Sequence, residues 1–289
     1  DVVDQAAVVK AVAAGHLAGA AFDVYAEEPP ASFEFAADDR ILATPHLGAS
    51  TEAAQLAVGT QAAEQMIDAL LRGEYPNALN IVSVSAEEME RLRPYCELAQ
   101  QLGKSAGYLN RGRPRAVRVT CFGEVAEHNT APIVNYGVMV GDNVNIVNAP
   151  HLAEERGMQV TSSVSRTQQG GFTDLIVLGL ATDAGEIEIA GTVLERKHPR
   201  IVRIGSFHTE VVPEGHLLMV FGKDRPGLIG KVGEALGRAG INIARMTFGR
   251  KEPGGDALLA LNLDSPCDEQ ALRRIRALDL VDRATPLPL

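Results

Sequence analysis

The first 80 residues alternate between helical and strand patterns of apolar positions. Residues 4–15 place small apolar side chains at helical spacing, and Gly15 is a typical helix end. The run Leu17–Val24 is apolar and has the length of a buried parallel strand, and Ile41–Thr44 is a second short strand. This alternation predicts an α/β fold for the first part of the chain.

The pattern that follows predicts one long helix over residues 51–72. Ser50 or Thr51 caps its beginning, Glu52 suits the positive end of the helix dipole, and Gly73 ends it. Its larger apolar side chains lie on one face, namely Leu56, Ala63, Ile67 and Leu70.

The middle of the chain mixes strand patterns with polar turns and predicts an α+β domain. Ser85 and Glu88 form a capping box that opens a helix, which Pro94 kinks or restarts. A second helix is expected at Ala149–Arg156. The expected strands are Ala116–Cys121, Leu175–Leu180, Glu186–Val193 and Ile201–Ile204.

The last part of the chain follows the ferredoxin-like order βαββαβ. A strand at His216–Phe221 precedes a helix that begins after Asp224–Gly227 and ends near Gly240. The remaining expected elements are strands at Ile241–Gly249 and Ala257–Asp264, a helix at Asp268–Leu278 and a strand at Val281–Pro286. With a boundary at the Tyr75-Pro76-Asn77 turn, we expect three domains, at residues 1–80, 81–211 and 212–289.

Composition and charge narrow the class of protein. The 289 residues are 46% hydrophobic with a net charge of −10, and residues 1–80 hold twelve acids against three bases. No basic cluster is large enough to bind nucleic acid, and no apolar run reaches the roughly 18 residues of a membrane span. Three cysteines without Cys-x-x-Cys spacing favour a reducing, cytoplasmic setting without a thiolate metal site.

His46 is the first candidate for chemistry, because it lies between a strand end and a helix beginning, where open α/β sheets bind ligands. A neutral imidazole there can take a proton from a substrate hydroxyl. Glu28 can fix its tautomer and stabilise the imidazolium. The alternatives are an ordinary loop histidine, a solvated acidic loop at Glu27 and Glu28, and a structural cap at Asp23, which ends an apolar strand.

Four sequence pieces resemble the catalytic unit of the D-2-hydroxyacid dehydrogenases, and more narrowly the long-form D-3-phosphoglycerate dehydrogenases within that family. They are VVD at 2–4, GHLAGAAFDVYAEEPP at 15–30, TPHLGAS at 44–50 and PNALNI at 76–81. The resemblance implies the end of a Rossmann-like, NAD-binding catalytic unit. It also implies that the chain is a C-terminal fragment, because the family's catalytic Arg-Gly pair and its Gly-x-Gly-x-x-Gly loop are absent from the sequence.

The resemblance assigns roles residue by residue. It implies that His46 is the acid/base, that Glu28 pairs with it, and that Asp23 helps hold the nicotinamide end of NAD. The backbone after the histidine also touches the cofactor in this family, so the secondary NAD-binding candidates are Leu47, Gly48 and Ala49, beside His46 itself.

The tail resembles an ACT domain, a module that binds amino acids. Asp224-Arg225-Pro226-Gly227 and Gly240-Ile241-Asn242-Ile243 carry the likeness. It implies that two such domains pair in a homo-oligomer and bind L-serine as an effector, with Asp224 and Asn242 as ligands. Alternatively, Asp224 caps the helix behind it, and both roles are compatible. The chain departs from some relatives two residues before Asp224, where Gly222 stands in place of a polar side chain.

The middle segment resembles the intervening domain of the same dehydrogenases at 145–150, 155–157 and 191–193. It carries no catalytic constellation. No role is assigned to the histidines without metal-ligand spacing, which are His128, His151, His198, His208 and His216. The basic cluster Arg196, Lys197, Arg200 and Arg203 fits a solvated face better than an anion site.

The resemblance implies NAD-dependent oxidation of 3-phosphoglycerate to 3-phosphohydroxypyruvate, the first step of L-serine biosynthesis, with this fragment inactive by itself. One alternative is a non-enzymatic fragment that binds an amino acid and directs assembly. Another is a different D-2-hydroxyacid dehydrogenase, although such relatives usually end soon after the helix that follows the histidine.

Overall fold

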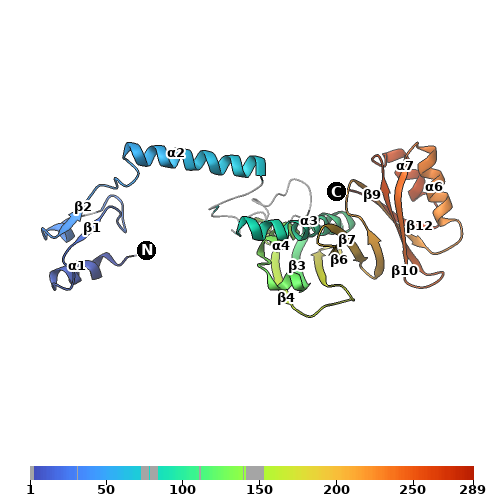
Figure 1. Ribbon diagram of the computed structural model, residues 1–289. Helices are drawn as coiled ribbons and strands as arrows, with labels where there is room; N and C mark the ends of the chain where they lie inside the picture. Colours follow the sequence, from blue (N-terminus) through green and yellow to red (C-terminus); the bar gives the residue numbers. More distant parts are fainter. Residues whose placement is uncertain are drawn as a thin grey trace. The chain divides into compact units, whose positions relative to one another are not determined.

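A computed structural model describes residues 3–30, 32–72, 78, 84–110, 112–138, 140 and 153–289 (Figure 1). The chain divides into two compact units, Asp1–Asn77 and Ala78–Leu289. Each unit is described by itself below.

The first unit contains a two-stranded parallel sheet between two helices along the chain. Helix α1 (Gln5–Ala13) begins at Asp4, whose side chain accepts a hydrogen bond from Ala7 N. Strand β1 (Ala20–Phe22) pairs with β2 (Ile41–Ala43), in register from Ala20 opposite Ile41 to Phe22 opposite Ala43. The short helix η1 (Glu34–Ala36) lies between them in sequence.

The prediction of a buried strand over Leu17–Val24 is wrong in length and in burial. Only three of those residues form β1, and Leu17 and Val24 are 42% and 60% exposed. The strand ends where the Asp23 side chain turns to bind the backbone of a neighbouring loop. A sheet of two described strands also has too little cover to bury both faces.

The long helix of the first unit confirms its predicted beginning. Helix α2 (Glu52–Ile67) is capped by Thr51, whose side chain accepts from Ala54 N at 3.1 Å. The chain then continues as a π-helical turn, η2 (Asp68–Arg72), and the predicted end at Gly73 lies outside the described residues. The larger side chains of the predicted apolar face are exposed, with Leu56 at 72% and Leu70 at 78%.

The second unit begins with helix α3 (Ala86–Leu109), which confirms the Ser85 cap, since Ser85 Oγ accepts from Glu88 N at 3.2 Å. The helix runs without a break through Pro94, so the predicted restart there is wrong. Pro94 is the ninth of the 24 residues of this helix.

A six-stranded sheet carries α3 on one face, in the order β4-β3-β5-β6-β7-β8 (Figure 1). The four predicted strands are present and extended at their ends, as β3 (Pro114–Gly123), β5 (Asp174–Thr182), β6 (Gly185–Leu194) and β7 (His198–Ile204). The sequence pattern missed β4 (Gln159–Ser165), β8 (Phe207–Val211), η3 (Glu124–Glu127) and α4 (Ala131–Gly137). Of the helix expected at 149–156, residues 149–152 lie outside the described residues, and 153–155 are helical.

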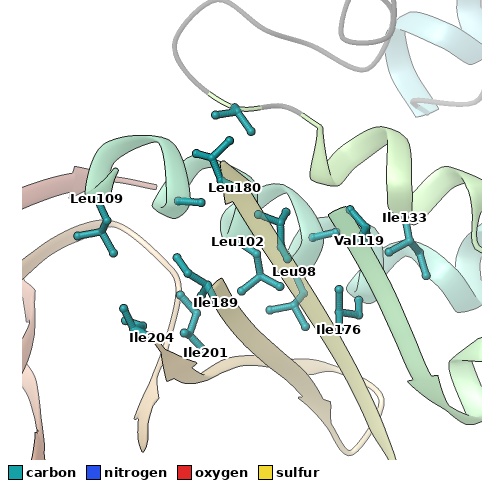
Figure 2. Close-up of a cluster of buried hydrophobic side chains, with 14 of the residues drawn as sticks. Leu98, Leu102, Leu109, Val119, Ile133, Ile176, Leu180, Ile189, Ile201 and Ile204 are labelled. Atoms are coloured by element: carbon teal, nitrogen blue, oxygen red, sulfur yellow. The ribbon is translucent and has the colours of Figure 1, made fainter. Parts of the chain in front are cut away.

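The core of this unit lies between α3, α4 and the sheet (Figure 2). Leu98 and Leu102 of α3 are fully buried against Ile176, Ile189 and other strand residues. Gly191 makes this close approach feasible, because a Cβ there would lie 2.7 Å from Leu98 Cδ1. This core buries the apolar side chains that the strand patterns predicted.

The last part of the chain confirms the ferredoxin-like order. Its elements are β9 (His216–Lys223), α6 (Leu228–Arg238), β10 (Ile243–Arg250), β11 (Asp256–Leu263), α7 (Glu269–Arg276) and β12 (Val281–Pro288). The antiparallel sheet has the order β10-β11-β9-β12. The two helices cover one face through a core that includes Leu228, Val232, Leu272 and Ile275.

Side chains from the two sheets of the second unit pack into one buried cluster. Leu217, Met219, Leu258 and Leu287 of the four-stranded sheet belong to the same buried cluster as α3. Asn262 donates to the carbonyls of Val212 and Glu214 in the segment that joins the sheets. The predicted boundary at 211/212 therefore lies inside one compact unit. Among the described residues, no helix is long and apolar enough to cross a membrane.

Candidate functional site

The parallel pairing of β1 and β2 brings two polar loops to one sheet edge. Asp23 follows β1, and residues 44–49 follow β2. Because the carboxyl ends of parallel strands meet at the same edge, the segments that carry Asp23, Glu28 and His46 come together there.

Asp23 holds the loop after β2 through three hydrogen bonds. Its Oδ1 accepts from Thr44 Oγ1 at 2.5 Å and from Leu47 N at 2.7 Å, and its Oδ2 accepts from Gly48 N at 2.7 Å. These bonds keep the pKa of Asp23 below its usual value, the Thr44 hydroxyl contributing most. A Cβ at position 48 would lie 3.2 Å from Asp23 Oδ2, which favours glycine there.

His46 and Glu28 form the predicted pair, with His46 Nδ1 2.8 Å from Glu28 Oε2. An ionised carboxylate can only accept, so the proton lies on Nδ1 and the neutral ring leaves Nε2 free to take a proton. His46 has a φ of 58°, a left-handed conformation that is uncommon for a residue other than glycine. Such a conformation persists only where the surroundings fix it, as the Asp23 bonds do on the next two residues.

Glu28 is held from its other oxygen by Tyr25, whose N–H donates to Oε1 at 3.0 Å. That bond, followed by the one from His46, lowers the pKa of Glu28. In return the hydrogen bond and the charge of Glu28 raise the pKa of His46 above 6.5. The lowered pKa of Glu28 and the raised pKa of His46 both favour an imidazolium next to a carboxylate.

The pair is accessible, because the side chains of His46 and Glu28 are 58% and 36% exposed. An open hollow next to Asp23 is lined by α1 and by the end of β1, including Lys10 and Phe22. The N–H groups of Leu47 and Gly48 both bind Asp23, and the carbonyl of Ala49 accepts from Gln55. The three predicted backbone positions therefore belong to one ordered loop.

In the last part of the chain, Asp224 already has partners. Its Oδ2 accepts from Arg250 Nη1 at 2.9 Å and from Gly254 N at 3.1 Å, which lowers its pKa, Arg250 contributing most. The alternative role of Asp224 as a helix cap is wrong, because α6 begins at Leu228 after Gly227 and has no side-chain cap.

Asn242 binds elsewhere, since its Nδ2 donates to Asp264 Oδ2 at 2.7 Å. Asp224 N donates to Gly255 O at one end of β11, and Asp264 N donates to Asn242 O at the other end. The nine residue steps from Gly255 to Asp264 separate these ends by about 30 Å, at ~3.3 Å per residue. One chain therefore does not bring the two predicted serine ligands together.

The basic cluster is divided among separate ion pairs. Arg203 binds Glu188 at 2.6 Å, Arg196 binds Glu124 at 3.1 Å, and Arg200 lies 3.6 Å from Glu210. Within the described part of the chain, no group of three His, Cys, Asp or Glu side chains is arranged to hold a metal ion.

Sequence reasoning missed four residues that shape these sites. Tyr25 and Thr44 support the histidine pair, and Arg250 and Asp264 engage the candidate effector residues. The signal for the first two is their position, because each lies two residues from Asp23 or His46. Arg250 and Asp264 lie 26 and 22 residues from their partners and leave no local signal.

Three family profiles match consecutive segments of the chain. Residues 1–48 match "D-isomer specific 2-hydroxyacid dehydrogenase, NAD binding domain", residues 91–205 match "D-3-phosphoglycerate dehydrogenase intervening domain", and residues 216–280 match "ACT domain". The first match contains Asp23, Glu28 and His46.

Curated relatives agree with these matches. D-3-phosphoglycerate dehydrogenases of Synechocystis sp. and Methanocaldococcus jannaschii are 37% and 36% identical, each over 95% of this chain and over 50% and 53% of their own length. The Bacillus subtilis protein of the same name is 32% identical over 95% of this chain and 53% of its own length. The chain spans about half the length of these relatives. It belongs to the D-2-hydroxyacid dehydrogenase family, and its three consecutive domain matches group it with the D-3-phosphoglycerate dehydrogenases.

Proposed function

We propose that this chain is the C-terminal part of a cytoplasmic D-3-phosphoglycerate dehydrogenase, which oxidises 3-phosphoglycerate to 3-phosphohydroxypyruvate with NAD in L-serine biosynthesis. The observation that carries the proposal is the 2.8 Å contact between His46 Nδ1 and Glu28 Oε2 at the carboxyl edge of a parallel sheet. This pair lies inside the segment that matches the NAD-binding dehydrogenase profile.

In the proposed reaction, His46 is the base. Its free Nε2 accepts the proton of the substrate's C2 hydroxyl while a hydride leaves the same carbon, and the ring becomes an imidazolium. Glu28 stabilises that charge through Nδ1–H, and Asp23 keeps the loop that carries the ring in place. In the reverse direction the imidazolium returns the proton.

The residues present fit the nicotinamide end of NAD, which when bound supplies the hydride acceptor. Among the described residues, Asp23 Oδ2 accepts a hydrogen bond from Gly48 N, and a carboxylate oxygen has a second lone pair for a carboxamide donor. Asp23 also lines an open hollow next to α1. Asp23 would thus hold both the catalytic loop and the cofactor.

The substitution His46→Ala in the complete protein tests the proposal. Turnover should fall by a factor on the order of 10²–10⁴, the usual contribution of a positioned base, while NAD affinity changes little. His16→Ala is the matched control, because His16 is an exposed histidine of the same unit with no assigned role. Wild-type turnover in His46→Ala would reject the assignment. Higher turnover of glyoxylate or pyruvate than of the phosphorylated substrate would favour a different member of the family.

A regulatory role is the second candidate function, because Asp224 and Asn242 lie at opposite ends of β11. Two copies of the ACT domain related by a twofold axis would bring Asp224 of one copy near Asn242 of the other. The proposal is that the chain forms a homo-oligomer and binds L-serine at this seam, with Asp224 holding the ammonium group. The ligand must then compete with Arg250 for that carboxylate.

Calorimetric titration of the chain with L-serine tests the regulatory role. Asp224→Ala and Asn242→Ala should each weaken binding by roughly 1–3 kcal/mol, the cost of one charge-assisted or buried hydrogen bond. Glycine and L-alanine are the control ligands, since both lack the hydroxyl group. If serine binds no better than alanine, or if both variants bind it as the wild type does, the serine role is wrong.

A further inference from the structure

Tyr25 contacts the carboxylate of the histidine–carboxylate pair and the loop that carries the histidine. Its N–H donates to Glu28 Oε1 at 3.0 Å, and its hydroxyl donates to the carbonyl of Thr44 at 2.6 Å, two residues before His46. The same hydroxyl lies 3.1 Å from the carbonyl of Phe22, the last residue of β1. One residue thus joins the end of β1, the beginning of the His46 loop and the Glu28 carboxylate.

The aromatic ring of Tyr25 is itself fixed. Tyr25 is only 8% exposed, and its ring packs 5.9 Å from Phe33 and 5.7 Å from Phe35, measured between centroids. Phe35 also packs edge-on against Phe22 at 6.0 Å. A ring held on several sides keeps its hydroxyl at one position, so the Thr44 carbonyl has a rigid donor.

The catalytic pair needs such support, because its own contact is weak in water. An exposed ion pair contributes little to its own geometry, since solvent screens the charges and the side chains lose entropy on pairing. The left-handed φ of His46 adds a conformational cost that other bonds must offset. Asp23 binds the Thr44 hydroxyl before His46 and the Leu47 N–H after it, and Tyr25 adds the bond that fixes the Thr44 carbonyl.

We infer that Tyr25 is a positioning residue for the proposed reaction, acting through Glu28 and the Thr44 carbonyl to keep His46 Nδ1 on the carboxylate. The inference rests on the proposed function and deepens it. Tyr25 touches neither of the reacting atoms, so its effect is on the geometry and protonation of His46. The charged groups that face His46 are Glu28 and Asp23, and both remain in a Tyr25→Phe variant.

The first measurement is steady-state kinetics of Tyr25→Phe in the complete protein. This substitution keeps the packed ring and removes the hydroxyl. We expect kcat to fall on the order of tenfold, because small misplacements of a catalytic group are costly. KM should change by less than about twofold, since binding of the ground state is untouched. The acidic limb of the pH profile should move to lower pH as the His46 loop moves away from Glu28, because the backbone N–H of residue 25 still holds Glu28 and only the bond to the Thr44 carbonyl is lost.

The second measurement does not depend on activity. Diethyl pyrocarbonate acylates only neutral imidazole, so the pH dependence of His46 modification, followed by mass spectrometry, reports the pKa of His46. In Tyr25→Phe this pKa should fall toward 6.5, and in Glu28→Gln it should fall further. Phe35→Leu is the matched control, because it weakens the same aromatic packing and keeps the hydroxyl; it should lower the pKa of His46 less than Tyr25→Phe does.

Wild-type kcat and an unshifted His46 pKa in Tyr25→Phe would overturn the inference. Equal changes in Phe35→Leu would also overturn it, since Tyr25 would then act through packing alone. If the pKa shifts in Tyr25→Phe while His46→Ala remains fully active, the proposed function fails, but the hold of Tyr25 on the pair stands.

Discussion

The two units of this chain differ in the amount of buried apolar core that stabilises each of them. Among the described residues of the first unit, only Val12, Tyr25 and Ile41 are buried apolar side chains. The second unit buries large clusters between α3 and one sheet and between α6, α7 and the other. The candidate catalytic pair lies in the unit with little core.

That difference separates two ways of fixing a side chain. In the second unit, Leu98 is immobilised by neighbours on all sides, and its position follows from close packing. In the first unit, His46 is positioned by its own hydrogen bond to Glu28 and by the bonds from the next two backbone N–H groups to Asp23. Hydrogen bonds give directional control at an exposed surface, where a reacting group must stay accessible, but each contributes only modestly to stability.

Hydrogen exchange of the 289-residue chain should reveal the largest contrast. Core amides of β5 and β11 exchange through global opening of a stable unit, with protection factors on the order of 10⁴ or more. Amides of β1 and β2 should show less than about 10²-fold protection, because a two-stranded sheet with little core is marginal. Mass spectrometry of exchanged peptides, with a urea-unfolded reference, makes the comparison. Equal protection of β1 and β5 would contradict the contrast between the units.

The same contrast explains which features the sequence predicted. The βαββαβ order was readable because each element carries its own apolar pattern and buries it locally, as α6 does with Leu228 and Val232. Strand β4 was missed because its residues are almost all exposed and polar, so they carry no alternation. Helix α4 and the edge strand β8 were missed for another reason, because at seven and five residues they are too short for their apolar positions to show a clear period.

The candidate site was predictable in its members but not in its bonds. His46 and Glu28 were paired from a family resemblance, and their 2.8 Å contact agrees with it. The loop clamp by Asp23 joins residues 21 to 25 positions apart, and no local pattern encodes such a contact. Asp224 illustrates the converse, because its local sequence suggested a helix cap while Arg250, 26 residues away, takes the carboxylate.

A core substitution tests packing in the second unit. Leu98→Ala should lower the free energy of unfolding of that unit by about 2–5 kcal/mol, since it removes a fully buried side chain and leaves a cavity. Leu56→Ala is the control in the first unit; because Leu56 is 72% exposed, its effect should stay within about 0.5 kcal/mol. Chemical denaturation followed by circular dichroism measures both. A comparable loss in the two variants would show that α2 is packed in solution.

A smaller effect is expected from the buried hydrogen bonds of Asp174. Tyr95 donates to Asp174 Oδ2 at 2.7 Å, Val125 N donates to Oδ1 at 2.6 Å, and burial raises the pKa of Tyr95. Tyr95→Phe should destabilise the second unit by roughly 1.5–3 kcal/mol, because a buried carboxylate loses a charge-assisted partner. Denaturant titration at neutral pH measures this. Unchanged stability would mean that water replaces the hydroxyl.

The smallest expected effect, and the one specific to the first unit, is the pH dependence of the histidine pair. Glu28 raises the pKa of His46, and the Tyr25 amide and His46 lower the pKa of Glu28. The contribution of the charged His46 to stability is therefore fully present below pH 6.5 and is lost as pH rises through the raised pKa of His46. The contribution of the ionised Glu28 to stability is present above pH 4.5 and is lost as pH falls through the lowered pKa of Glu28.

Glu28→Gln in the complete protein should therefore act on both rate and pH profile. Turnover should fall by roughly tenfold to a hundredfold, less than in His46→Ala, because the base remains but its imidazolium loses a stabilising charge. The acidic limb should move to lower pH, since His46 then becomes neutral nearer 6.5. Glu27→Gln is the matched control, because it removes the neighbouring carboxylate, whereas among the described residues His46 pairs with Glu28. If Glu27→Gln moves the limb as far as Glu28→Gln does, the general acidity of the loop, and not the 2.8 Å contact, sets the protonation of His46.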